Sequence, residues 1–178
     1  ISTVQVVPLA AATEEEVSPD GFDANGNVVK FSEDAAHSQF RPKGPVYKNT
    51  VINDDVTIRG AYYIIQGTVT INGNLTVDGR DSGGLVLYEG ATLTVTGALI
   101  HSGGSAFYIY GQSYKDNGNG ARGTTGRLII ENSKGDGAAI RSTANTANLG
   151  IRTGVLEIHD GGSNELIDGV RLYSTHPA

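Results

Sequence analysis

The sequence predicts an all-β protein in which residues 50–178 form a right-handed parallel β-helix, a solenoid of a few coils. Three observations predict this fold. Residues 46–176 contain no proline, as a continuous β-ladder requires, because proline cannot donate a ladder hydrogen bond. Short runs that alternate apolar and polar residues recur between glycines, and no window has the 3.6-residue period of a helix. These runs also repeat in blocks along the chain.

The alternating runs mark the expected strands, and glycines mark the corners between them. Of the 25 glycines, 22 follow residue 50, and glycine readily adopts the positive φ that tight corners need. The expected strands are residues 56–58, 62–65, 68–71, 74–77, 85–88, 92–95, 98–100, 107–110, 127–130, 138–141, 155–158 and 169–172.

A longer repeat is superimposed on the alternation. If Val69, Leu93, Leu128 and Leu156 are equivalent, the steps between them are 24, 35 and 28 residues. The long middle step contains a polar insert, residues 111–126. Quasi-regular steps of strand without helix favour a solenoid, in which inward aliphatic side chains stack as ladders. An antiparallel sandwich or jelly roll, which also has many short strands, is the alternative.

Residues 1–49 are expected to form a separate extension with an apolar strand and a hairpin. The segment Thr3-Val4-Gln5-Val6-Val7 is a strand former, and an acidic break, residues 14–16, follows it. Residues 22–31 carry a hairpin signal, because Asn25-Gly26 suits the two positive-φ positions of a type I′ turn.

Composition excludes several classes of partner. The net charge of −6 repels phosphate backbones, so nucleic acid is not an expected partner. No apolar run approaches the roughly 20 residues that span a bilayer. The chain has no cysteine, which excludes disulfides and thiolate metal sites. It opens at Ile1 and contains no methionine, which predicts removal of a signal peptide and a secreted or cell-surface location.

A calcium site is the one cofactor for which the sequence offers ligands. Asp20, Asp23 and Asn25 resemble the start of an EF-hand loop. The bidentate glutamate of such a loop would fall at Ser32, although Glu33 is adjacent. The hairpin explains the same residues more simply. We therefore expect no cofactor, with Ca²⁺ as the alternative.

Catalytic constellations are not evident. His37, His101, His159 and His176 form no pair at metal-ligand spacing. His159-Asp160 with Ser102 or Ser105 could build a hydrolytic triad, but no nucleophile elbow is present, and turns explain these residues better. The chain is therefore not expected to be an enzyme.

Six charged residues allow a polysaccharide lyase-like alternative, since lyases on pectate-lyase-like solenoids use acidic residues for calcium and an arginine or lysine base. Opposite charges at a corner are more often a solvated ion pair. The six are Asp136, Arg141, Arg152, Asp160, Asp168 and Arg171.

Tyrosines form the most suggestive candidate contact. If Leu85, Leu87, Phe107 and Ile109 point inward, alternation places other side chains outward. An exposed tyrosine ladder can stack on sugar rings or contact a protein, although tyrosine also favours strands without any further role. The candidates for glycan or protein contact are Tyr88, Tyr108, Tyr110 and Tyr114.

The repeat texture resembles that of known surface proteins. Residues 67–77, GTVTINGNLTV, and 84–95, GLVLYEGATLTV, are similar to the glycine-cornered coils of β-helical surface proteins of Gram-positive bacteria. Some of these are carbohydrate-binding domains and others are adhesin stalks. The resemblance covers about residues 50–175, implies exposure at the cell surface with glycan contact, and transfers no binding residue.

The sequence thus predicts a non-catalytic extracellular structural or adhesive subunit. The bare edges of a solenoid recruit further strands, so self-assembly into a filament or surface layer is expected, by end-to-end stacking or by donation of Thr3–Val7 to a neighbour. The predicted partners are further copies of the chain. The alternatives are a module that binds an acidic polysaccharide and a lyase-like β-helix.

Overall fold

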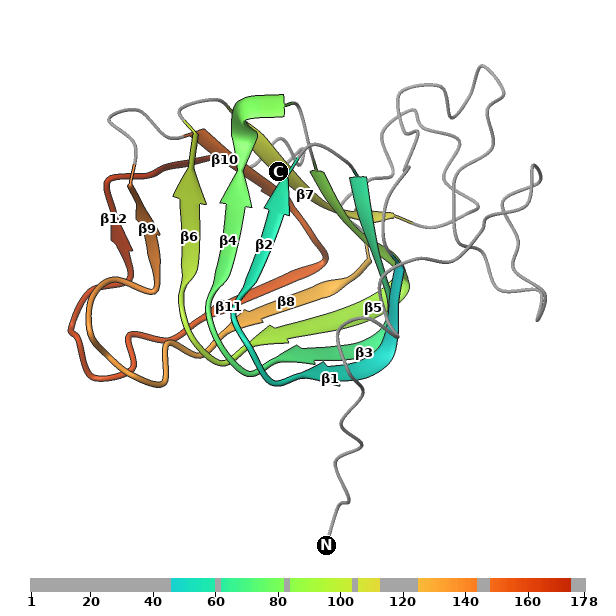
Figure 1. Ribbon diagram of the computed structural model, residues 1–178, viewed down its shortest axis with the longest axis horizontal. Coiled ribbons are helices and arrows are strands. Elements are labelled where there is room, and N and C mark those ends of the chain that lie inside the picture. Colours follow the sequence, from blue (N-terminus) through green and yellow to red (C-terminus); the bar gives the residue numbers. More distant parts are fainter. Residues whose placement is uncertain are drawn as a thin grey trace, which may run out of the picture.

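The computed structural model describes residues 46–59, 62–81, 84–103, 106–112, 125–143 and 148–173 (Figure 1). The predicted strand Thr3–Val7, the calcium candidates Asp20, Asp23 and Asn25, and Tyr114 lie outside these residues. Within them, the elements are β1 Val46–Ile52, β2 Val56–Arg59, β3 Tyr62–Ile71, β4 Leu75–Asp78, the 3₁₀ turn η1 Gly79–Asp81, β5 Gly84–Val95, β6 Leu99–Ser102, β7 Phe107–Gln112, β8 Arg127–Ile130, β9 Ile140–Ser142, β10 Asn148–Arg152, β11 Val155–Ile158, β12 Ile167–Asp168 and β13 Arg171–Tyr173.

The described strands form two sheets in which every pairing is parallel. One sheet has the order β1-β3-β5-β7-β10-β13, with β8 pairing β5 and β11 pairing β8, and the other has the order β2-β4-β6-β9-β12. The prediction of an all-β, parallel fold is confirmed, and the antiparallel alternative is wrong. Among the described residues no helix is long and apolar enough to cross a membrane.

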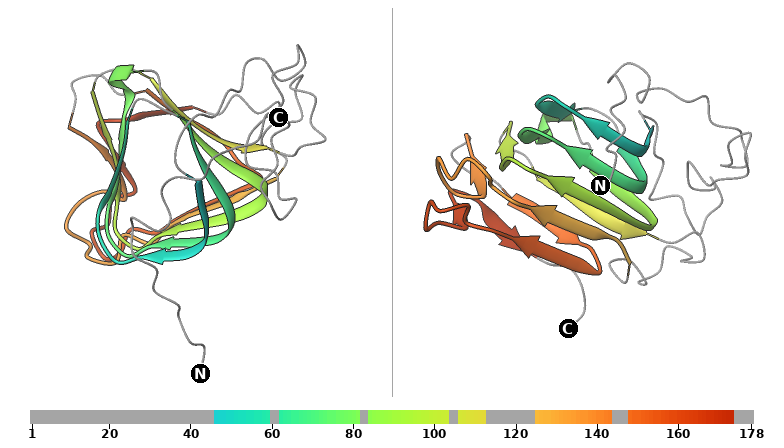
Figure 2. Two further views of the ribbon diagram at one scale, coloured as in Figure 1. Left: turned by 45° about the vertical axis from the view of Figure 1, so that its right-hand side comes forward. Right: turned by 90° about the horizontal axis from the view of Figure 1, so that it is seen from below.

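The strands occur in layers that pair with the layers before and after them. We name three sides of each layer. Side A contains residues 46–48, 62–66 and 84–88, then β7, β10 and β13; side B contains residues 50–52, 68–71 and 92–95, then β8 and β11; side C contains β2, β4, β6, β9 and β12. Figure 2 shows the sides around a common interior in its left panel and the stacked layers in its right panel.

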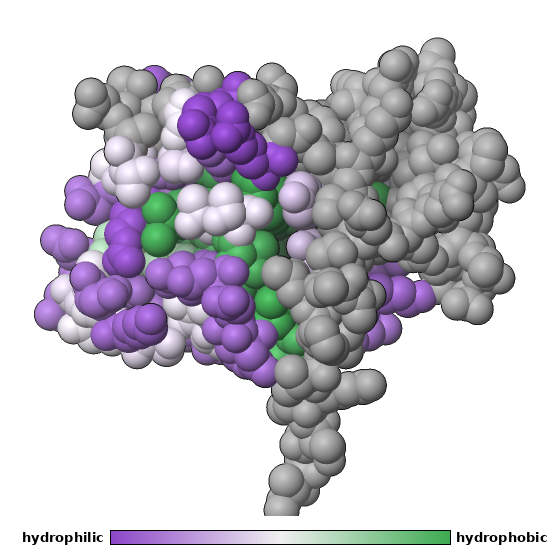
Figure 3. Space-filling model, viewed as in Figure 1, coloured by the Kyte–Doolittle hydropathy of each residue, from purple (hydrophilic) through white to green (hydrophobic). Residues whose placement is uncertain are grey.

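The register confirms the equivalence that the sequence predicted. Val69 pairs with Leu93, Leu93 with Leu128, and Leu128 with Leu156. The first three of these side chains are fully buried in one continuous core. Because strands alternate inward and outward side chains, each inward position becomes an aliphatic row that runs through the layers. On the face that Figure 3 shows, most of the coloured residues are hydrophilic or intermediate, and apolar residues appear in patches between them.

The corner between sides A and B depends on left-handed backbone. Asn49 and Gly67 have φ of 45° and 63°. Asn49 Oδ1 accepts a hydrogen bond of 3.0 Å from the Thr68 amide of the next layer, and a Cβ on Gly67 would overlap that oxygen. Asparagine and glycine are the residues that tolerate such φ, so the chain bends here without losing the ladder.

The corner between sides B and C is held by amide and carboxylate side chains that bond to the next layer. Asp55 Oδ1 accepts from the Asn74 amide at 2.8 Å, and Asn74 Oδ1 accepts from the Ala98 amide at 2.9 Å. The Gly97 amide donates to the Gly73 carbonyl at 2.9 Å. A Cβ on Gly97 would lie 2.6 Å from that carbonyl oxygen, so the close approach of layers requires glycine.

Candidate functional site

The last layer leaves three strand edges without a partner among the described residues. These are the outer edges of β11 on side B, β12 on side C and β13 on side A. We call these edges and the apolar side chains beside them the open rim. The side chains are Leu156, Ile158, Leu166, Ile167 and Leu172.

Exposure along one inward row shows that the interior opens at this rim. On side C the row runs through Val56, Leu75, Leu99, Ile140 and Ile167. The first four are between 0% and 4% exposed, whereas Ile167 is 43% exposed. All five have the same inward orientation, and among the described residues no strand pairs with the outer edge of β12.

The other rows change in the same way. Leu156 and Ile158 are only partly buried, while Leu128 and Ile130, their partners one layer before, are fully buried. Leu172 is likewise partly buried beside fully buried Leu149. The rim therefore exposes apolar side chains together with unpaired backbone groups.

The opposite end of the described stack is closed. The inward side chains of β1 and β2 are Tyr47, Ile52, Val56 and Ile58, and none is more than 4% exposed. These strands have a partner strand on one edge only, as β11 and β12 do, yet their side chains are shielded from water. The two ends are thus physically different.

Charged groups also distinguish the rim. Glu157 of β11 accepts from Arg127 Nη2 at 3.1 Å, and its Oε1 lies 2.9 Å from His159 Nε2. The contact with His159, followed by that with Arg127, lowers the pKa of Glu157. By contrast, Asp168 of β12 and Arg171 of β13 are exposed, and neither forms an ion pair among the described residues.

The tyrosine candidates are only partly gathered. Leu85, Leu87, Phe107 and Ile109 are fully buried in the core, as the alternation predicted. Tyr108 and Tyr110 are half-buried on the other face of side A and stack with ring centroids 5.7 Å apart and planes inclined by 12°.

The expectation that Tyr88 is exposed is wrong, since it is 1% exposed. It shares its sheet face with Ile64 and Val86, which alternate with core residues and are nevertheless 0% exposed. Side A is therefore buried on both faces at this point. Alternation predicts on which face of a sheet a side chain lies, but not whether that face meets solvent.

Three of the six charged residues of the lyase-like alternative are neighbours on side C, where Arg141 contacts Asp136 and has Asp168 as its in-register partner on β12. The other three lie elsewhere. Arg141 bonds Asp136 at 3.3 Å at the start of side C. Arg152 lies on β10 of side A, opposite Tyr110. Asp160 is at the B–C corner, where its Oδ1 accepts from the Gly162 amide at 2.9 Å. Asp168 and Arg171 are on different sides of the last layer.

The triad candidates are also not brought together. The described partner of the His159 ring is Glu157, and Asp160 caps a turn. His101 is fully buried in an inward row between Val77 and Ser142. Ser105 lies outside the described residues. No group of three His, Asp or Glu side chains in the described part of the chain could hold a metal ion.

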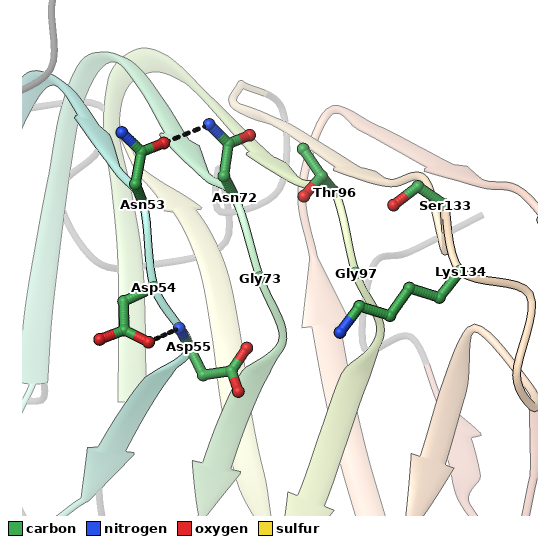
Figure 4. A pocket seen from close by; sticks show the side chains of 9 residues that line it. All are labelled: Asn53, Asp54, Asp55, Asn72, Gly73, Thr96, Gly97, Ser133 and Lys134. Atoms are coloured by element: carbon green, nitrogen blue, oxygen red, sulfur yellow. Dashed lines mark hydrogen bonds between the residues drawn. The ribbon is translucent and has the colours of Figure 1, made fainter.

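A polar hollow of about 290 Å³ lies at the B–C corner, where Figure 4 shows its lining. Its side chains bond each other and the backbone: Asn72 Nδ2 donates to Asn53 Oδ1 at 2.7 Å, and the Asp55 amide donates to Asp54 Oδ1 at 2.8 Å. Lys134 lies over the same corner. These contacts have a structural role in holding the corner.

Asn132 is a structural residue that sequence reasoning missed. It has φ of 49° and is 1% exposed, and its Nδ2 donates at 2.8 Å to the carbonyls of both Gly137 and Asp160. It therefore joins the long corner of the fourth layer to the layer after it. The sequence signal that could have found it is an asparagine shortly after the strand run 127–130, because asparagine tolerates the left-handed backbone of a corner.

Comparison of the chain with protein-family models, with curated proteins and with solved structures gives no match.

Proposed function

We propose that the layers are coils of a right-handed parallel β-helix and that the protein is a non-catalytic structural or adhesive subunit, which self-associates through the open rim. The exposure of Ile167 at 43%, in a row whose other members are at most 4% exposed, carries this proposal.

The rim combines two forces that favour association. Apolar side chains gain about 25 cal/mol for each Å² removed from water, and Leu166 and Ile167 of the rim are exposed by 46% and 43%. In addition, an uncovered strand edge presents unpaired amides and carbonyls that pair readily with another strand. A further copy that covers the rim would satisfy both.

Self-assembly into a filament or a surface layer outside the cell is the biological setting that fits such a subunit. Two contacts are open: end-to-end packing at the rim, and donation of the strand Thr3–Val7 by a neighbour. The secreted or cell-surface location is proposed from the resemblance of the repeats to those of bacterial surface proteins.

Light scattering over a range of protein concentrations tests the proposal. The wild-type chain is expected to grow in mass with concentration, and Ile167→Asp, which places a charge on the rim, is expected to remain monomeric. Thr57→Asp is the matched control, since Thr57 is exposed on the outer face of β2 and should leave association unchanged. A wild-type chain that stays monomeric at every concentration would refute the proposal.

A carbohydrate-binding module for acidic polysaccharide is the second candidate, favoured by the half-exposed stack of Tyr108 and Tyr110. Aromatic rings of this kind can pack against sugar rings. Binding of polygalacturonate that is lost in Tyr108→Ala and Tyr110→Ala, but kept in Ile167→Asp, would support this candidate. Absence of binding by the wild-type chain would exclude it for that polysaccharide.

A further inference from the structure

We propose that the open rim binds the segment Thr3–Val7 of a second copy as an added parallel strand on side B, beyond β11. This inference rests on the proposed self-association and adds which edge accepts the segment and in what register. The segment itself, called the donor segment below, lies outside the described residues. Addition of a strand to an exposed sheet edge is a common mode of peptide recognition.

The donor segment has the residue pattern of a side B strand. On side B, residues 68–71 read TVTI and residues 92–95 read TLTV, and residues 3–6 read TVQV. In both side B strands the aliphatic side chains are buried in the core, whereas the threonines lie on the outer face. The donor segment therefore repeats the order of threonine, aliphatic, polar and aliphatic residues that side B already contains.

The rim is stepped between sides A and B. Side A has six described strands and ends with β13, whereas side B has five and ends with β11. Neighbouring strands lie about 4.8 Å apart, so a strand added beyond β11 would be level with β13. Leu172 of β13 is partly buried and packs against the core. An added strand on side B would lie beside it and extend the same interior.

Continuation of the side B rows fixes the register of the added strand. Val4 would follow Leu156, and Val6 would follow Ile158. Leu156 and Ile158 are the inward side chains of β11, and both are only partly buried. A register shifted by one residue would turn both valines outward and Gln5 inward, because side chains alternate along a strand. The apolar interior thus favours one register.

The residues that follow the donor segment suit the rim of side C. In the first three layers, four residues separate the last inward residue of side B from the first inward residue of side C. The same step from Val6 reaches the apolar run of residues 8–12. Pro8 would then fall in the corner, outside the ladders from which proline is excluded. The run would cover Leu166 and Ile167, the most exposed side chains of the rim.

The connection between Val7 and Val46 is long enough to join two copies. It contains 38 residues, and an extended chain covers about 3.3 Å per residue, so it can reach up to about 125 Å. Six stacked strands have a height of only about 24 Å. In the single chain Leu166 and Ile167 are 46% and 43% exposed, so the rim is open to a strand from a second copy.

Strand donation makes the contact propagate. Each copy has one donor segment and one rim, so the two contacting surfaces differ and the contact is heterologous. Heterologous contacts that do not close into a ring produce open filaments. The first layer of one copy does not need to touch the rim of another, so shielded side chains such as Ile52 and Ile58, which are 2% and 1% exposed, remain shielded.

A matched pair of lysine substitutions in the full-length chain tests the orientation of the added strand. Val4→Lys would place an ammonium group in the apolar interior, so it should weaken association by about tenfold or more. Gln5→Lys introduces the same charge on the outer face and should leave the association constant within about threefold of the wild-type value. Sedimentation velocity over a range of protein concentrations measures both variants.

Cysteine pairs test the register. The chain has no native cysteine, and in-register residues of neighbouring strands, about 4.8 Å apart, are within disulfide range. In a mixture of Gln5→Cys and Glu157→Cys chains, mild oxidation should join position 5 of one chain to position 157 of the other, which mass spectrometry of the linked peptides identifies. A mixture of Gln5→Cys and Thr57→Cys chains is the control and should form no such link, since Thr57 is exposed on β2 of the first layer.

The outcomes separate this contact from the proposed self-association. A wild-type chain that stays monomeric at every concentration overturns both. Equal association of Val4→Lys and Gln5→Lys, without a link between positions 5 and 157, overturns strand donation and leaves self-association through the rim standing. A Gln5→Cys/Glu157→Cys chain that forms the link within itself and stays monomeric would assign the donor segment to the rim of its own chain, which overturns the contact between copies.

Discussion

Alanine substitution at Ile140 and at Ile167 compares the same change in the same row, one layer apart. Ile140 is 0% exposed and Ile167 is 43% exposed. Ile140→Ala removes fully packed methyl and methylene groups and leaves a cavity, at a cost of about 2 to 5 kcal/mol in the free energy of unfolding. Ile167→Ala should cost the monomer about half as much or less, roughly 1 to 2 kcal/mol.

Urea unfolding followed by circular dichroism at low and high protein concentration measures both effects. Association stabilises the folded chain by mass action, so the wild-type and Ile140→Ala midpoints should rise with concentration. Ile167→Ala should lose most of this rise, because its side chain lies at the rim. Equal costs for the two substitutions at low concentration would refute the view that the interior opens at the last layer.

Four further substitutions test the corners and the buried charge. Gly97→Ala should destabilise the chain by about 2 to 4 kcal/mol because its Cβ would overlap a neighbouring layer. Gly162→Ala should cost only about 1 to 2 kcal/mol, since Gly162 has φ of 92° and no atom lies within 4 Å of the added Cβ. Urea midpoints compare the two variants, and similar midpoints would contradict the close approach of layers at Gly97. Asp78→Asn should cost about 1 to 2 kcal/mol at pH 7, since hydrogen bonds from Arg80 lower the pKa of the 4%-exposed Asp78 carboxyl from 3.8 to about 2. In thermal melts the wild-type chain should lose this stability as pH falls from about 4 towards 2. The variant should lack that loss. Asn132→Ala removes two hydrogen bonds at a left-handed position and should cost about 2 to 3 kcal/mol of stability in the same melts. A change below about 0.5 kcal/mol would show that other contacts hold the long corner.

The parallel, layered fold could be predicted because its signals are local and repeat. Alternation identified most strands, and the leucine row from Leu93 to Leu156 gave the register through two layers of different length. β1, β10 and β12 were not among the expected strands. β10 contains Gly150, which interrupts the alternation, and it follows a polar stretch without a clear strand signal.

The candidate site was less predictable because exposure is a property of the whole chain. Tyr88 and Ile167 illustrate this: the first was expected outside and is shielded, and the second belongs to an inward row and is exposed. The sequence indicated bare edges at both ends. The two ends differ in the exposure of the inward side chains of their outermost strands, which the sequence does not indicate.

Amide hydrogen exchange at low and high protein concentration tests whether the open rim is the surface through which the protein associates. We expect the backbone amides of β11, β12 and β13 to gain protection as concentration rises, while those of β1 and β2 remain unchanged. Protection gained at β1 and β2, or at no strand edge, would contradict it.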